Sequence, residues 1–135
     1  MIRTDIDIKD AIYDWIAGSD TVAAISGAVY KDQRPLNSKK EDIEITILTR
    51  DGGKQIQSAY VNVNIFVPDI KRGGDMIEDT ARLRTLCALA AEDFDYVHNG
   101  SSIFELDSQQ VYRVNDADLH AINNRILVRF NNEQD

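Results

Sequence analysis

Residues 60–67 read Tyr-Val-Asn-Val-Asn-Ile-Phe-Val, with an aliphatic side chain at every odd-numbered position. Side chains alternate between the two faces of a β-strand, so this run places all its aliphatic residues on one face. An earlier run over 43–47, Ile-Glu-Ile-Thr-Ile, alternates in the same way, and Asp51-Gly52-Gly53 between the two runs is turn chemistry. The two runs predict a long β-hairpin over residues 43–67.

Helical periodicity precedes and follows this hairpin. Apolar residues spaced at i, i+4, i+7 and i+8 predict an amphipathic helix over 5–17, and a shorter helix carrying Val22 and Ile25 follows it. A broad apolar stripe predicts a long helix over 76–94, with Asp75 as its N-cap. So wide an apolar face is expected to lie across a sheet.

Short strands and loops complete the pattern. Strands are expected at 28–30, 103–106, 111–114 and 126–130, and loops or turns at 31–42, 71–75, 99–101 and 115–118. We therefore predict an α+β fold: an antiparallel or mixed β-sheet of about four to six strands, with a long helix packed on one face and an N-terminal helical pair. At 135 residues the chain is expected to form a single domain, 1–135.

The overall charge and the cysteine content exclude several classes of protein. A net charge of −8 opposes general nucleic-acid binding, which requires clustered Lys and Arg. No stretch has the roughly 18 apolar residues of a membrane span, and no signal peptide is recognisable, so no membrane partner is expected. The single cysteine, Cys87, lies in an apolar helical pattern and suits a reducing compartment as a small core residue.

No motif for catalysis or for metal binding is apparent. The two histidines, His98 and His120, stand in no recognisable nucleophile–base pattern and are interpreted as surface or partly satisfied imidazoles. The three Asp-x-Asp pairs lack the further oxygen ligands of a calcium loop, and solvated turns or helix caps explain them: 5/7, 93/95 and 116/118. The Arg72-Gly73-Gly74-Asp75 stretch lacks the spacing of a phosphate loop. We expect no enzyme activity, no cofactor and no metal.

Basic residues near the predicted hairpin are the remaining candidates for function. Lys39 and Lys40 precede it, and Arg50 and Lys54 flank its tip, where polar residues continue into the second strand. These residues are either ordinary solvated loop charges or an electrostatic contact with an acidic neighbouring subunit. On the second interpretation the hairpin projects from the domain, and the predicted subunit-interface residues are Lys39, Lys40, Arg50, Lys54, Gln55, Gln57 and Tyr60.

The order and spacing of the elements resemble the tail-completion, or tail-terminator, proteins of long-tailed bacteriophages. The stretches that carry the resemblance are IKDAIYDWI (8–16), SDTVAAISGAVY (19–30), VNVNIFV (61–67), ARLR (81–84), YRVNDADLH (112–120) and RILVRF (125–130). Pro35 falls where that family tends to have a proline before its next strand, whereas residues 31–42 are more charged than the family's usual Pro- and Gly-rich stretch. The resemblance spans nearly the whole chain and depends on order and length, not on one specific motif.

The resemblance implies a non-enzymatic structural subunit for virion assembly. Such proteins form a homo-oligomeric ring, often a hexamer, that terminates the tail tube and joins it to the head. The implied partners are further copies of the chain, the tail-tube protein and the head–tail connector, with DNA as passing cargo. The implied location is the virion tail, after assembly in the bacterial cytoplasm. The alternative is a stand-alone bacterial protein-binding or regulatory domain with a protein ligand.

Overall fold

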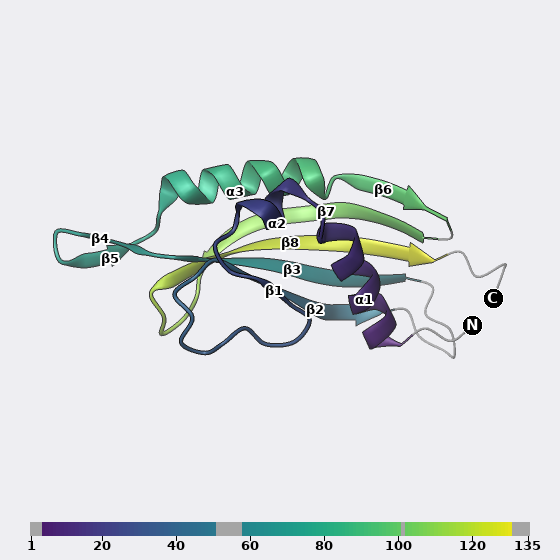
Figure 1. Cartoon of the computed structure of the whole chain (residues 1–135), viewed down its shortest axis with the longest axis horizontal. Coiled ribbons are helices and arrows are strands. Elements are labelled where there is room, and N and C mark those ends of the chain that lie inside the picture. The colour runs from purple at the N-terminus through teal and green to yellow at the C-terminus, as the bar shows by residue number, and fades with distance from the viewer. Residues whose placement is uncertain (1–3, 51–57, 101, 131–135) are drawn as a thin grey trace.

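A six-stranded mixed sheet forms the body of the protein (Figure 1). The computed structural model describes residues 4–50, 58–100 and 102–130, and the sheet has the strand order β1-β2-β3-β8-β7-β6. Its strands are β1 (Val29–Tyr30), β2 (Asp42–Arg50), β3 (Ser58–Pro68), β6 (Tyr96–Asn99), β7 (Ser102–Arg113) and β8 (Leu119–Phe130). Only β1 and β2 pair in parallel; the other neighbours are antiparallel. The predicted mixed sheet within an α+β fold is therefore confirmed.

The alternation that opens the sequence sets which face of the sheet is buried. Every second residue of β3 is buried, from Ala59 to Val67. Val61 pairs with Ile47 of β2 and with Ile126 of β8, so the aliphatic positions of three strands form continuous rows. Rows of this kind fix the register, because a one-residue slip would turn every buried side chain toward solvent.

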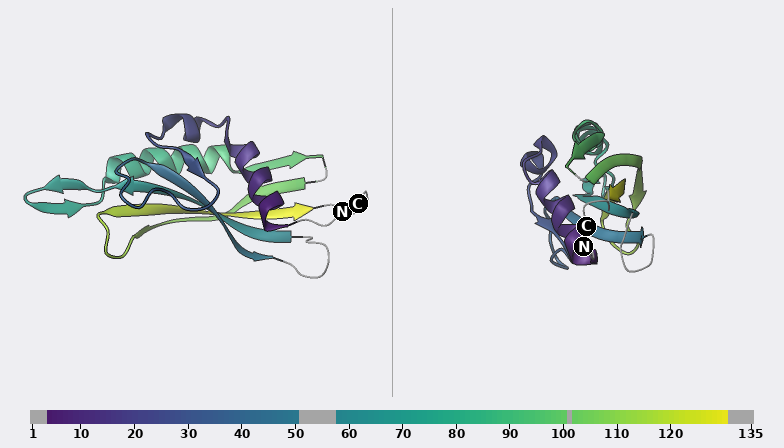
Figure 2. Two further views of the ribbon diagram at one scale, coloured as in Figure 1. Left: turned by 60° about the horizontal axis from the view of Figure 1, so that its bottom comes forward. Right: turned by 90° about the vertical axis from the view of Figure 1, so that its right-hand side faces the viewer.

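Within the described residues, three helices accompany the sheet: α1 (Asp5–Ile16), α2 (Asp20–Ala24) and α3 (Thr80–Asp93). Ile8, Ile12 and Ile16 of α1 are fully or almost fully buried and join the same hydrophobic core as the strands. In α3 the buried residues are Leu83, Leu86 and Ala90, and Phe94 just beyond the helix is also buried. The end-on view in Figure 2 shows that the sheet is curled, not flat. No helix of the described residues is long and apolar enough to cross a membrane.

Side chains of α3 hold both ends of the five-residue helix α2. At its start, the Asp93 carboxylate accepts hydrogen bonds from the backbone N–H and the hydroxyl of buried Thr21, at 2.8 and 2.6 Å. At its end, Arg82 donates to the carbonyl of Ala24 at 2.6 Å and makes a two-pronged ion pair with Glu41, at 2.6 and 2.8 Å. A helix this short is not stable alone, so its position depends on α3.

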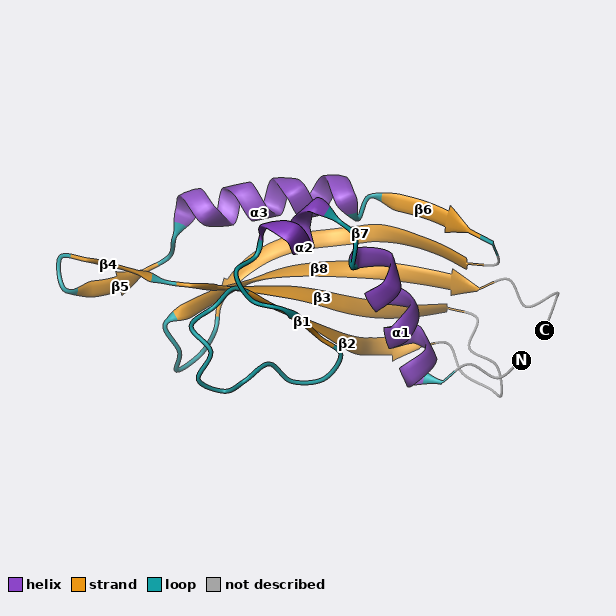
Figure 3. Ribbon diagram, viewed as in Figure 1, coloured by secondary structure: helices purple, strands orange, loops and turns teal. Residues whose placement is uncertain are grey.

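A small hairpin of two strands, β4 (Ile70–Arg72) and β5 (Asp75–Ile77), projects beyond the end of the sheet (Figure 3). The predicted start of the long helix is therefore wrong. The helix begins at Thr80 with Asp79 as its N-cap, and not at 76 with Asp75 as its N-cap. The physical reason is the Gly73-Gly74 pair, whose positive φ values of 59° and 89° form a tight turn between two extended segments.

The prediction that the 43–67 hairpin projects is wrong for its strands. β3 pairs with β2 on one side and, along its whole length from Ser58 to Pro68, with β8 on the other. β3 is thus interior to the sheet along its whole length, whereas β2 has a second neighbour only at Ile43 and Glu44, where β1 pairs with it. The predicted turn at 51–53 lies outside the described residues.

The strands after α3 also differ from those predicted. The expected strands at 103–106 and 111–114 are one strand, β7, with a register shift at Asp107 between Leu106 and Ser108. A β-bulge of this kind breaks the period-two pattern, so the strand looks like two segments in the sequence. The short strand β6 was not predicted; it joins β7 through the turn at Gly100, whose φ is 60°.

Candidate subunit interface

The base of the projecting hairpin is fixed by an Asp–His pair. Asp69 lies between β3 and β4, its side chain is almost fully buried, and its carboxylate lies 2.7 Å from Nδ1 of His120 on β8. The backbone N–H of Asp69 also donates to the carbonyl of Asp118 in the β7–β8 turn. These contacts hold the chain in place where it leaves the sheet, so the hairpin starts from a rigid point.

Apolar side chains are exposed on this hairpin and beside its base. Ile70 and Met76 are both exposed, and Leu36 in the loop before β2 is 82% exposed. Leu36, Met76 and Leu119 contribute to a groove of about 600 Å³ between that loop, the hairpin and the β7–β8 turn. Clustered exposed apolar side chains on a soluble protein mark an interaction surface.

The hairpin carries two basic side chains, Lys71 and Arg72, and one acidic side chain, Asp75, which is the cross-strand partner of Arg72. Lys71 and Arg72 are both exposed, and among the described side chains neither has an ion-pair partner. Arg34 and Arg82, by contrast, are committed to internal ion pairs with Asp42 and Glu41. With Asp75 included, residues 70–77 carry a net charge of +1 on a chain whose net charge is −8.

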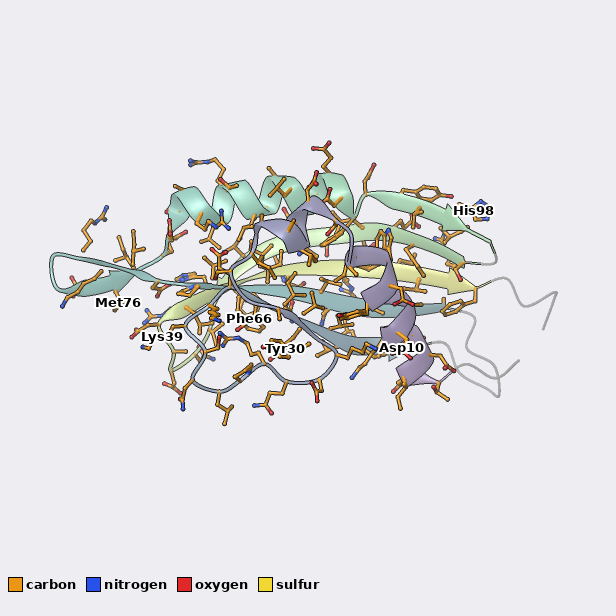
Figure 4. The ribbon with its side chains drawn as sticks, in the orientation of Figure 1. Asp10, Tyr30, Lys39, Phe66, Met76 and His98 are labelled. Atoms are coloured by element: carbon orange, nitrogen blue, oxygen red, sulfur yellow. The ribbon has the colours of Figure 1, made fainter. Side chains whose placement is uncertain are left out.

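A second candidate surface lies at the opposite end of the sheet, between α1 and the edge strand β1. Its groove has a volume of about 540 Å³, and its apolar lining comes from Ile6, Tyr13, Val29 and Tyr30. Ile6 is 69% exposed although it is aliphatic. Figure 4 shows Asp10 and Tyr30 near this groove, with Met76 far away on the hairpin.

Charges surround this groove on both of its walls. Lys31 donates to Asp10 at 2.7 Å, and its ammonium lies 4.8 Å from the centre of the Tyr13 ring. The hydrogen bond to Asp10 raises the pKa of Lys31. Two lysines, Lys9 and Lys31, and two aspartates, Asp10 and Asp32, line the groove, so its lining carries no net charge.

The loop over 31–41 between the two surfaces is held by a buried ion pair that the sequence reading missed. Arg34 Nε donates to Asp42 at 3.1 Å, and the Ser38 hydroxyl donates to the same carboxylate oxygen at 2.5 Å. The guanidinium also donates to the carbonyls of Ser38 and Lys40 and lies 5.0 Å from the centre of the Phe66 ring. Asp42, a charged residue at the start of an alternating strand, was the only sign of this ion pair in the sequence, and the sequence did not identify Arg34 as its partner.

The structure does not bring the sequence-predicted interface residues together. Lys39 and Lys40 are exposed before β2, whereas Arg50 is its last residue. At about 3.3 Å per step, the eight steps from Asp42 to Arg50 separate the two ends of the strand by about 26 Å. Tyr60 is half-buried, and the Arg125 guanidinium lies 4.4 Å from its ring centre. Lys54, Gln55 and Gln57 lie outside the described residues. The expected single basic patch at one place is therefore wrong; only Lys39 lines the groove beside the projecting hairpin.

The described residues offer little that resembles a catalytic or metal-binding site. His120 and Asp69 border a pocket of about 580 Å³ that also includes Arg72, Thr80 and Arg113. A carboxylate-oriented imidazole is one part of a catalytic triad, yet no described hydroxyl or thiol hydrogen-bonds the other ring nitrogen of His120. Among the residues that the structure describes, no group of three or more His, Cys, Asp or Glu side chains is placed to hold a metal ion.

Comparison with known proteins does not assign the chain to a family. No protein-family model matches the sequence, and no curated protein matches it. The interpretation of the two surfaces therefore depends on their own geometry and charge.

Proposed function

We propose that this protein is a structural assembly subunit of a phage or prophage tail, which forms a homo-oligomeric ring that ends the tail tube and joins it to the head. The projecting β4–β5 hairpin is the observation that carries the proposal. It is a two-stranded sheet paired with no other described strand, and it carries exposed Ile70 and Met76. A two-stranded hairpin is at best marginally stable in water, so such an extension suits a contact with another molecule.

The arrangement of the remaining elements is consistent with the tail-terminator resemblance. In this proposal α3 is the family's long helix over one face of the sheet, and α1 with α2 is its N-terminal helical pair. The strand β3 and the terminal strand β8 correspond to the two β-stretches that suggested the resemblance, over 61–67 and 125–130.

The charge of the chain is consistent with passage of DNA without binding. In a ring of subunits that each carry a net charge of −8, an acidic inner surface would repel DNA at short range. DNA in this proposal is cargo, and the protein partners are the tail-tube and connector proteins.

The proposal is tested by the mass and the shape of the purified protein. Light scattering over a wide concentration range is expected to show a closed oligomer, and negative-stain electron microscopy is expected to show rings. A protein that stays monomeric up to millimolar concentration, and that does not assemble when the tail-tube protein from a neighbouring gene is added, would contradict the proposal.

A stand-alone protein-binding domain is the second candidate. The same exposed hairpin and grooves can bind a different protein, in which case no ring is needed. Genomic position separates the two candidates, because neighbouring genes for capsid, portal and tube proteins favour the tail function.

A further inference from the structure

We propose that the β4–β5 hairpin, residues 70–77, is a hinged arm whose direction is set by one latch, the Asp69–His120 pair. The latch is closed in this structure, and the arm extends away from the end of the sheet (Figure 1). When the latch opens, the arm turns as a unit about the two points where the chain enters and leaves it. The inference concerns a single chain and needs no ring, so it goes beyond the proposed function and can fail independently of it.

The first support is the small number of contacts between the arm and the rest of the protein. Residues 70–76 are all exposed, and Ile77 at the end of β5 is half-buried. The two strands of the arm pair only with each other. Across the described part of the chain, no hydrogen bond and no ion pair joins residues 70–77 to the sheet or to α3. Segments with few buried contacts and exposed backbone are the parts of a fold that move most easily.

The second support is that the chain is held just before and just after the arm. Before it, the backbone N–H of Asp69 donates to the carbonyl of Asp118 at 2.9 Å. After it, the Asp79 carboxylate caps α3 by accepting a hydrogen bond from the N–H of Arg82 at 3.2 Å. Rotation is therefore confined to the short links on either side of residues 70–77. Hinges are typically a few residues of this kind at the ends of elements.

The third support is the open space beside the arm. A pocket of about 580 Å³ lies between the arm, the start of α3 and Arg113, and a groove of about 600 Å³ lies between Met76, the loop before β2 and the β7–β8 turn. Asp69 lines both spaces, so the latch lies where both of them meet the base of the arm. No residue of the arm belongs to the hydrophobic core, so the arm can turn toward either space without unpacking the core.

The latch itself is a short hydrogen bond with little access to water. Oδ1 of Asp69 lies 2.7 Å from Nδ1 of His120, and the two side chains are 2% and 15% exposed. An ionised carboxylate only accepts hydrogen bonds, so Nδ1 carries the proton of this bond. No other described side chain hydrogen-bonds the Asp69 carboxylate. Removing the donor therefore leaves the carboxylate without a protein partner, and only reorientation of the arm can bring it into water.

Distances between spin labels, measured by double electron–electron resonance, test the latch. The arm pair carries nitroxides at Lys71→Cys and Glu92→Cys, and the body pair carries them at Glu92→Cys and Asn115→Cys. All three labelled positions are exposed, and Cys87→Ser removes the native thiol. Labelled protein is diluted with unlabelled protein of the same variant, so that only distances within one chain are measured.

Three variants separate the latch from other effects. His120→Leu removes the donor, whereas His120→Asn keeps an amide N–H at the position of Nδ1. His98→Leu, at an exposed histidine of β6, is the matched control. The double variant Asp69→Leu with His120→Leu removes both partners and leaves no buried carboxylate unpaired, so it tests the arm even if the single leucine variant does not fold.

The expected result is a change in the arm pair alone. The parent gives one narrow distance distribution for each pair. His120→Leu and the double variant broaden the arm-pair distribution at least about twofold, or split it, and leave the body pair unchanged. His120→Asn and His98→Leu give the distributions of the parent.

Other results overturn the inference. An arm-pair distribution that stays narrow in the leucine variants shows that contacts other than the latch fix the arm. A broad arm-pair distribution in the parent shows that the pair does not hold the arm. Broadening of both pairs in the leucine variants shows that the whole domain loosens and that no hinge is present. A parent that is monomeric, but whose arm is released by His120→Leu, supports the inference while contradicting the proposed ring.

Discussion

Replacing Asp42 with asparagine is expected to destabilise the protein by about 3 kcal/mol, because it breaks the buried pair with Arg34. The two side chains are 1% and 10% exposed, so water cannot replace the lost partner. The wild-type carboxylate accepts hydrogen bonds from Arg34, from the Ser38 hydroxyl and from the backbone N–H of Ala28. The single side-chain oxygen of asparagine can accept only some of these hydrogen bonds. Its N–H₂ group would lie beside the positively charged Arg34 guanidinium.

The magnitude follows from what remains around Arg34 in the variant. Removing one partner of a buried ion pair costs about 3–5 kcal/mol. The guanidinium keeps its hydrogen bonds to two backbone carbonyls and its position over the Phe66 ring, which places the cost at the lower end. Domains have total stabilities of about 5–15 kcal/mol, so the loss is a large fraction and corresponds to roughly 12 °C in Tm.

Urea unfolding monitored by circular dichroism measures this cost directly. The control is Asp32→Asn, an exposed residue of the same loop, which is expected to change stability by less than about 0.5 kcal/mol. In an Arg34→Met background, Asp42→Asn is expected to cost far less, because no buried cation is left unpaired. A cost below about 1 kcal/mol, or the same cost in both backgrounds, would refute the assignment of this pair as the anchor of the loop.

Three further substitutions or reactions test the packing. Leu83→Ala is expected to cost about 2–5 kcal/mol in urea unfolding, whereas exposed Arg84→Ala on the same helix is expected to be close to neutral. Gly27→Ala is expected to cost about 1–3 kcal/mol, because the added methyl group would overlap the Asp42 side chain and the backbone carbonyl of Glu41. Gly18→Ala, with no atom within 4 Å of the added carbon, is the matched control, and equal Tm values for the two variants would contradict the close approach. Burial raises the pKa of the Cys87 thiol, so less thiolate is present in the folded state at mildly alkaline pH. Alkylation by iodoacetamide is therefore expected to be slower in buffer than in urea. Equal rates would show an accessible, unperturbed thiol.

The sheet and its buried face were predictable because they depend on a local pattern. The alternation over 60–67 becomes the central strand β3, whose odd-numbered residues are buried. The β7 strand shows the limit of this reasoning, since the bulge at Asp107 shifts the alternation by one residue and hides the continuity of the strand. Local periodicity reports burial well only while the register stays constant.

The projecting hairpin was missed although its signal was present. Ile70 and Ile77 flank a Gly-Gly pair, which is a hairpin pattern, but Asp75 before an apolar run also resembles a helix N-cap. The sequence does not distinguish Asp75 from Asp79 as the N-cap. The structure does, because the Asp79 carboxylate accepts a hydrogen bond from the backbone N–H of Arg82 at 3.2 Å. The helix predicted over 76–94 therefore included residues that belong to β5.

The candidate surfaces could not be predicted from the sequence, because they combine distant segments. The groove between α1 and β1 joins residues near position 6 to residues near position 30, and only the fold brings them together. The predicted basic patch failed for the converse reason. Lys40 and Arg50 are close in the sequence, yet an extended strand carries them to opposite ends of the sheet.

The dependence of α2 on α3 has a consequence for the order of folding. Thr21 donates its tertiary hydrogen bonds to Asp93, and the carbonyl of Ala24 accepts one from Arg82; these partners follow in the chain by about seventy and sixty residues. Nascent α2 on a ribosome therefore has no stable structure until α3 has emerged, and the region before β2 should be among the last to gain protection from hydrogen exchange. The groove beside α1 and β1 would then mature late, after the hairpin strands β4 and β5 have been made.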